Sequence, residues 1–182
     1  MQTTITASSN SILNNENLIR AVHFPKLVLP IAIVIQQLQQ YFISLLVLLI
    51  IILATGEPIT LMWLTLPLVL LMQTLFTAGL ALVLARWGAR SRDVKQLLPF
   101  VTRTWRYASG VFFSIAAFTA TLPQFVGSVL TINPGAVYID LVRDSLMASE
   151  SSPPLIWIMG LVWGVLFFVL GLIYFYRGEK NY

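Results

Sequence analysis

Long uncharged stretches, separated by short charged segments, dominate the pattern of this 182-residue chain. Four of them contain 30, 28, 33 and 26 residues, bounded by the pairs Lys26/Glu57, Glu57/Arg86, Arg106/Asp140 and Glu150/Arg177. An α-helix needs about 20 apolar residues to cross the hydrocarbon layer of a membrane. The first, second and fourth stretches therefore predict single membrane-spanning helices, at about residues 28–54, 61–85 and 154–176.

The third stretch has a different pattern. Its compact apolar part runs from Tyr107 to Leu122, and Pro123, Gly127 and the turn signal Asn133-Pro134-Gly135 then interrupt it. Two crossings joined by a turn would need more residues than it has. It predicts one span at about 97–121, followed by short re-entrant or outer helices at about 123–148, the second of them over 136–147. Non-helical backbone at that depth must be buried in protein or line a cavity.

The distribution of positive charge agrees with four crossings. Ten of the eleven Lys and Arg residues then fall on the side that holds both termini: Arg20, Lys26, Arg86, Arg90, Arg92, Lys95, Arg103, Arg106, Arg177 and Lys180. Only Arg143 lies on the opposite side. Because cytoplasmic loops carry an excess of Lys and Arg, we expect both termini in the cytoplasm. The predicted fold class is all-α, a polytopic membrane protein with four transmembrane helices.

Composition excludes several classes of protein. The chain is 58% hydrophobic and 10% charged, which excludes a soluble enzyme, a disordered tail and a collagen-like fibre. It has no cysteine and a single histidine, His23, so thiolate or histidine metal sites and a Ser-His-Asp triad are not expected. The ATP-binding pattern GxxxxGK[ST] is absent as well. We therefore expect no catalytic residue, no metal and no cofactor bound by this chain.

Residues 1–26 are predicted to form a cytoplasmic segment ahead of the transmembrane domain, residues 27–182. The segment begins with a polar stretch that has neither the basic nor the apolar region of a signal peptide. Asn15 is suited to cap a short amphipathic helix, with Leu18, Ile19 and Val22 on one face and Pro25 at its end. From the residues alone, this helix either rests on lipid or docks onto a soluble partner.

Several polar and aromatic residues leave two interpretations open. Gln36, Gln37, Gln39 and Gln40 in the first span either bond to neighbouring helices or line a path for solute. Arg103 and Arg106 either extend toward the membrane surface or contact a phosphate-bearing lipid headgroup. Tyr107, Phe112 and Phe113, with Phe118, are candidates to line a channel, or else face lipid and neighbouring helices. Asp140, Arg143 and Asp144 are expected to pair on a wet helix surface.

Three runs of sequence resemble those of ABC-2 type permeases that export polysaccharides. Asn14–Lys26 (NNENLIRAVHFPK) resembles the run NxNLIxxVxFP, and Arg92–Pro99 (RDVKQLLP) resembles RDVxQxLP. Ile132-Asn133-Pro134 with Leu141-Val142-Arg143 resembles the segment NP…YR. Order and spacing agree over residues 14–180. The nearest subgroup exports O-antigen, teichoic acid or cell-wall galactan on a lipid carrier.

The resemblance implies further roles. It makes the Asn14–Lys26 segment the helix that couples to a nucleotide-binding ATPase subunit, through Asn15, Leu18, Ile19, Arg20, Val22 and Phe24. It implies two permeases and two ATPases in a bacterial plasma membrane, with ATP and Mg²⁺ on the ATPase and a lipid-linked glycan passing between the permeases. Family members carry about two further spans before the coupling segment. We therefore expect this chain to lack the N-terminal third, as a truncation or through a mis-set start.

The leading hypothesis from the sequence is thus a permease subunit of an ATP-driven exporter of lipid-linked polysaccharide. Arg103 and Arg106 are its candidate headgroup contacts. One alternative is an ABC-2 permease for drugs or small lipids. The other is a truncated assembly partner that transports nothing. No binding to nucleic acid is expected, because the basic residues are spread over several segments without interleaved aromatic residues.

Overall fold

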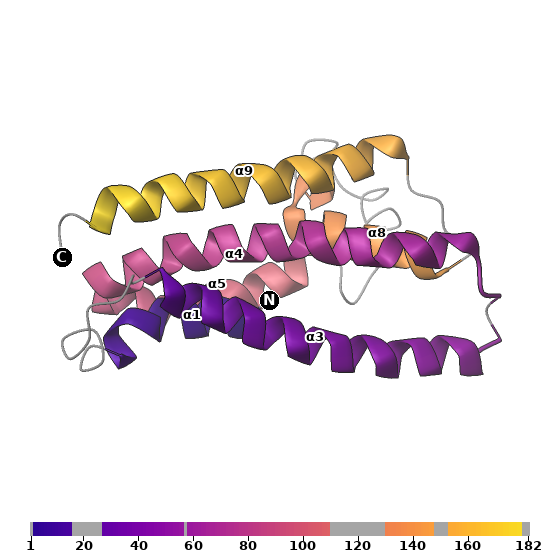
Figure 1. The fold of residues 1–182 in the computed structure, drawn as a ribbon, viewed down its shortest axis with the longest axis horizontal. Coiled ribbons are helices and arrows are strands. Elements are labelled where there is room, and N and C mark those ends of the chain that lie inside the picture. The colour runs from indigo at the N-terminus through magenta and orange to yellow at the C-terminus, as the bar shows by residue number, and fades with distance from the viewer. Residues whose placement is uncertain (1, 16–26, 57, 110–129, 148–152, 180–182) are drawn as a thin grey trace.

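The computed structural model describes residues 2–15, 27–56, 58–109, 130–147 and 153–179, and every regular element in these ranges is helical. Three long helices run side by side along the molecule, and shorter helices pack against them (Figure 1). The predicted all-α class is confirmed for this part of the chain.

Three helices among the described residues are long and apolar enough to cross a membrane. They are α3 (Val28–Ala54), α4 (Leu66–Arg90) together with the short 3-10 helix η1 (Leu61–Thr65) that leads into it, and α9 (Pro154–Glu179). They lie where the sequence predicted helices at 28–54, 61–85 and 154–176, although α4 continues to Arg90. The chain is therefore a multi-pass membrane protein.

The fourth predicted span is only partly described. Its first residues belong to α5 (Arg92–Ala108), which is not among the three apolar helices, and residues 110–129 lie outside the described part of the chain. Of the predicted outer helices at 123–148, the structure describes α8 (Pro134–Leu146). The Asn-Pro-Gly signal marks its start, because Asn133 caps the helix and Pro134 occupies its first position.

Helix α4 occupies the centre of the bundle. Among the 18 most apolar consecutive residues of each long helix, 50% are buried in the helix that contains α4, 17% in α9 and 6% in α3. Helices α4 and α9 end together, at what we call the basic end, where Arg90 and Arg177 lie (Figure 1). At their closest approach, a Cβ atom on Gly79 or Gly171 would overlap backbone atoms of the facing helix. Glycine at these positions allows the two backbones to touch.

Helices α5 and α8 each extend along about half of the bundle. Trp105, near the end of α5, packs against Phe76 in the middle of α4, with ring centroids 6.3 Å apart. Leu146, at the end of α8, packs with Ile52 and Leu66 at the end opposite the basic one. In Figure 1, α5 accordingly lies toward the basic end and α8 toward the other.

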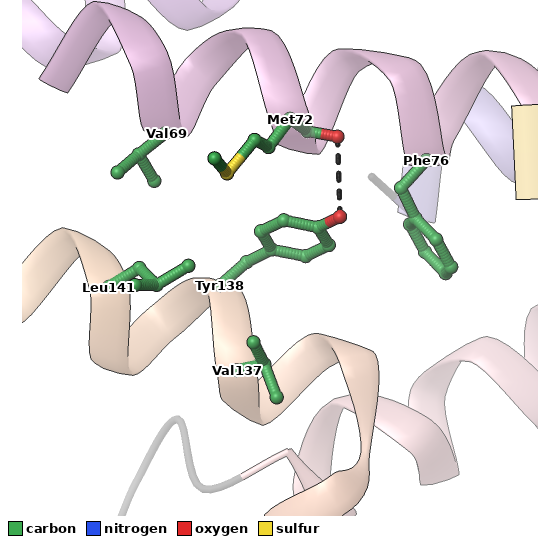
Figure 2. Packing of buried hydrophobic residues seen from close by; sticks show 6 residues of the cluster. All are labelled: Val69, Met72, Phe76, Val137, Tyr138 and Leu141. Carbon is green, nitrogen blue, oxygen red and sulfur yellow. Dashed lines mark hydrogen bonds between the residues drawn. The ribbon is translucent and has the colours of Figure 1, made fainter. Parts of the chain in front are cut away.

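Residues of α4 and α8 form the main hydrophobic core. Val69, Met72 and Phe76 of α4 face Val137, Tyr138 and Leu141 of α8, and all six side chains are buried (Figure 2). The Tyr138 hydroxyl lies 3.2 Å from the carbonyl oxygen of Met72 and 2.8 Å from that of Gly160 on α9. Because it can donate to either carbonyl, this one side chain links α8 to both long helices.

The chain also contains a helix that the sequence analysis did not predict, α1 (Gln2–Asn14), in the stretch expected to be a cytoplasmic segment. It packs against α3, α4 and α5. Thr4, Ser8 and Ser9 are fully buried, and Gly88 of α4 lies directly against the Ser9 backbone. Small side chains therefore allow a polar helix to pack closely on an apolar one.

Candidate functional site

A cavity of about 590 Å³ lies between α1, α3, α4, α5 and α8. Its volume falls in the range of small-molecule sites in proteins. Five helices contribute its walls, through Thr3, Ile5, Tyr41, Ser44, Leu45, Leu48, Leu70, Gln73, Thr102, Trp105, Arg106, Ser109, Gly135, Tyr138, Ile139, Val142 and Arg143. We take this cavity as the candidate site.

Aliphatic and aromatic side chains form most of the cavity wall. Leu45 and Leu48 come from α3, Leu70 from α4, and Ile139 and Val142 from α8. The apolar faces of these three helices meet there and form this part of the wall. Such a wall suits an apolar molecule, or the apolar part of an amphiphile.

Polar groups are few and lie at defined places. The Gln73 side-chain amide donates to the Tyr41 hydroxyl at 3.2 Å, so these two groups join α4 to α3 at the cavity. The hydroxyls of Thr102 and Ser109 donate to carbonyl oxygens of their own helix, at 2.8 Å each. Gln73 is a single side-chain amide within an uncharged span. The sequence analysis could have singled it out for that reason and did not.

Two arginines line the cavity from different helices. Arg143 of α8 lies 3.7 Å from Asp140 on the same helix, which confirms the predicted pairing one helical turn apart. Arg106 of α5 is exposed, and its guanidinium carbon lies 5.9 Å from the centre of the Tyr107 ring. Guanidinium groups bind phosphate and carboxylate well, so the cavity combines apolar walls with cationic groups. That combination suits an anionic amphiphile.

Asp144, which was predicted to pair with Asp140 and Arg143 on a wet helix surface, lies elsewhere. Asp144 is buried rather than on a wet surface, and it accepts a hydrogen bond from the indole nitrogen of Trp157 at 3.0 Å. The reason is that α9 packs over this side of α8. Asp144 therefore links α8 to the start of α9 and does not line the cavity.

Asn133 holds the junction of α5 and α8 at the edge of the cavity. Its side-chain oxygen accepts from the Trp105 indole at 2.6 Å and from the Gly135 backbone at 3.1 Å. Its side-chain nitrogen donates to the Ala108 carbonyl and to the Ser109 hydroxyl, both at 3.3 Å. The first residue of the predicted turn signal thus caps α8 and also joins two helices, which only the tertiary structure reveals.

The predicted site residues have different outcomes. Arg106 lines the cavity, whereas Arg103 is exposed and does not. Tyr107 is 51% exposed and is not part of the wall. Asn15 follows α1, and its amide nitrogen donates to the Ser11 carbonyl at 2.8 Å. The remaining predicted residues lie outside the described part of the chain: Leu18, Ile19, Arg20, Val22, Phe24, Phe112 and Phe113.

Taken together, these features define a helical, multi-pass membrane protein with a cavity between its helices. No group of three or more His, Cys, Asp or Glu residues that would suit a metal ion occurs among the described residues.

No protein-family model matches the chain. It is similar to the O-antigen export system permease protein RfbA of Myxococcus xanthus, with 27% identity over 114 residues. The matched region covers 63% of this chain and 44% of that protein, less than half of the relative's length.

Proposed function

We propose that the chain is a membrane-spanning permease subunit of an ATP-binding cassette exporter that moves lipid-linked polysaccharide across a bacterial plasma membrane. The observation that carries the proposal is the 114-residue likeness to an O-antigen export permease. The bundle of apolar helices supports it, because a permease must cross the bilayer several times.

In this proposal the basic end of the bundle faces the cytoplasm, as do both termini, because cytoplasmic loops are rich in Lys and Arg. The segment between α1 and α3 then couples the permease to a separate ATPase subunit. Asn15, Leu18, Ile19, Arg20, Val22 and Phe24 are the proposed coupling residues. ATP and Mg²⁺ bind to that ATPase, and two permeases pair around the path of the glycan.

The cavity gives the cargo a place for its lipid part. Its apolar wall suits the hydrocarbon chain, and Arg106, with Arg103 on the same helix, suits the phosphate groups of the carrier. Tyr107, Phe112 and Phe113 remain the proposed lining of a path for sugar rings.

Co-purification tests the coupling assignment. The chain, expressed with an ATP-binding cassette ATPase of the same genome, is expected to retain the ATPase in detergent. The variant with Leu18→Asp and Ile19→Asp is expected to lose it. A matched control changes Ile59 and Leu61 to Asp, because these apolar residues are 70% and 87% exposed near the other end of the bundle. Equal retention by both variants would remove the coupling assignment.

The predominantly apolar cavity favours a second candidate, a permease for a drug or a small lipid. Transport into inverted membrane vesicles distinguishes the two. Uptake of a lipid-linked glycan that depends on ATP supports the first, whereas uptake of a free hydrophobic compound supports the second. A truncated assembly partner, the third candidate, would give neither.

A further inference from the structure

Two arginines line the same cavity at different levels of the bundle. Arg106 comes three residues before Ser109, whose side chain lies against Gly135 at the junction of α5 and α8. Arg143 comes eight residues after Gly135 on α8, about 12 Å further along the helix axis at 1.5 Å per residue. Because α5 lies toward the basic end and α8 toward the other (Figure 1), we call Arg106 the inner arginine and Arg143 the outer arginine.

The inner arginine lies deep in the bundle for a charged residue. Its neighbour Trp105 packs on Phe76, which is fourteen residues, about 21 Å, from the Arg90 end of α4. The whole hydrocarbon layer is about 30 Å thick. A charged side chain at such depth is costly unless it faces a cavity or other protein groups, and such residues are typical of the paths of charged ligands. The depth of Arg106 therefore favours an anion in the cavity.

A pair of hydrogen-bonding groups lies on the cavity wall between the two arginines. The Gln73 side chain of α4 donates to the Tyr41 hydroxyl of α3, and both residues line the cavity. Along α4, Gln73 follows Met72, which contacts α8, and comes before Phe76, which contacts the end of α5. Amide and phenol groups can donate hydrogen bonds to phosphate oxygens. An anion that passes from one arginine to the other therefore meets polar groups on the way.

The outer arginine has a carboxylate beside it. Asp140 lies one helical turn before Arg143, and its Oδ1 atom is 3.7 Å from the guanidinium nitrogen Nη1. That distance is longer than a hydrogen bond, and the side chains of Arg143 and Asp140 are 33% and 36% exposed. So exposed an ion pair is weak, and a phosphate can displace the carboxylate. Asp144, the next carboxylate of α8, bonds instead to Trp157 on α9.

The inner arginine has an aromatic neighbour. Its guanidinium carbon lies 5.9 Å from the centre of the Tyr107 ring. An aromatic ring attracts a cation but carries no net negative charge that would repel an anion. A pathway needs groups that bind the ligand well enough for entry and weakly enough for exit. The inner arginine suits capture of a phosphate, and the outer arginine, beside a carboxylate, suits its release.

We infer that Arg143 is a second, weaker phosphate-binding group of the cavity, and that Asp140 lowers its affinity for phosphate by competing for the guanidinium. The phosphate of an amphiphile is then held first at Arg106 and released from Arg143. The inference rests on the proposed function, because it assigns residues to the path of the lipid phosphate through the cavity.

Equilibrium titration of the purified chain in dodecyl maltoside with dodecyl phosphate, a single-chain amphiphile, tests the inference. Arg106→Gln removes the stronger group and is expected to weaken binding about 10-fold. Adding Asp140→Asn to this variant is expected to restore binding about 5-fold, because Arg143 loses its competitor and an exposed ion pair is worth up to about that factor. Adding Arg143→Gln as well is expected to abolish the gain.

Asp93→Asn, placed in the Arg106→Gln chain, is the matched control. Asp93 is an exposed carboxylate in the first turn of α5 and does not line the cavity, so its loss changes the net charge equally. We expect it to change the affinity less than ~2-fold, because solvent and salt screen a distant exposed charge. An equal gain from Asp93→Asn, or a gain from Asp140→Asn that persists without Arg143, would overturn the inference.

The same titrations separate this inference from the proposed function. If Arg106→Gln weakens binding and Asp140→Asn restores nothing, the outer group is overturned while the cavity keeps its proposed lipid. If Arg106→Gln leaves binding unchanged, the phosphate does not enter the cavity, and both assignments are overturned. Dodecanol, the same chain without phosphate, is expected to bind all variants equally. A parallel change in its affinity would attribute the effects to the shape of the cavity and overturn the inference.

Discussion

The substitution Gly171→Ala lies at the close contact between α4 and α9. Its added methyl group affects the free energy of unfolding in two opposite ways. Gly171→Ala adds a single carbon, and alanine favours a helix over glycine by about 1 kcal/mol. The added Cβ would, however, lie 2.8 Å from Gly79 Cα, where ordinary contacts begin at 3.4 Å. The obstruction is backbone, which cannot rotate away. The Gly79 carbonyl oxygen would lie closer still, so the helices must separate by at least about 0.6 Å, the difference of these two distances.

That separation affects the whole interface. Phe76 and Phe167, whose ring centroids are 4.8 Å apart, lie across the same pair of helices. A gap of 0.5–1 Å forfeits roughly a quarter to a half of each dispersion contact. Overpacking of this kind costs about 1–3 kcal/mol. Because the obstruction is backbone, we take the upper end of this range, and about 1 kcal/mol is regained in helix propensity. We therefore expect Gly171→Ala to lower the free energy of unfolding by about 2 kcal/mol, which is about 4–8 °C in melting temperature for a chain of this size.

Gly160→Ala on the same helix is the matched control. Its added Cβ would lie 2.7 Å from Leu141 Cδ1, the far end of a flexible side chain that can move. We expect an unfolding temperature within about 2 °C of the parent chain, because helix propensity offsets the small rearrangement. Thermal unfolding in detergent, followed by circular dichroism, measures both variants. A Gly171→Ala chain as stable as the parent would refute the argument for contact between the backbones.

Two further predictions concern the core and the cavity. Tyr138→Phe retains the ring but removes the hydroxyl that reaches the Met72 and Gly160 carbonyls, so the free energy of unfolding is expected to fall by about 1 kcal/mol in a denaturant titration. A loss above about 3 kcal/mol would contradict a role limited to this hydrogen bond. Arg106→Gln is expected to weaken binding of a phosphate-bearing amphiphile about 10-fold in equilibrium titrations, because a charged hydrogen bond is lost, whereas Arg90→Gln, outside the cavity, changes it less than ~2-fold. Equal effects would mean that only net charge matters.

The long helices were predictable because their signal is contained in each segment. An uncharged stretch of the required length predicts a span wherever it occurs, and α3 begins and ends within the predicted range 28–54. The start of α8 was nearly predictable for the same reason, because the local turn signal Asn133-Pro134-Gly135 gave a helix from residue 136 and α8 begins at Pro134. The pair Asp140 and Arg143 follows from helix spacing alone.

The elements that the sequence did not reveal depend on contacts between segments. Helix α1 has few apolar residues, and its burial depends on small residues, Ser8 and Ser9, that pack on a helix far away in the chain. The burial of Asp144 follows from Trp157, thirteen positions further along. The cavity combines side chains of five helices, so no single segment carries a signal for it.

Asn133 satisfies backbone groups where the end of α5 meets the start of α8 inside the bundle. The end of α5 leaves carbonyl groups without partners and the start of α8 leaves N–H groups without partners, which is costly where water is absent. Asn133 bonds to one group of each kind, the Ala108 carbonyl and the Gly135 N–H. Its side-chain oxygen also accepts a hydrogen bond from the Trp105 indole. Trp105, Ser109 and Gly135 also line the cavity. The junction and the cavity are therefore one feature, because three residues that bond to Asn133 also form part of the cavity wall.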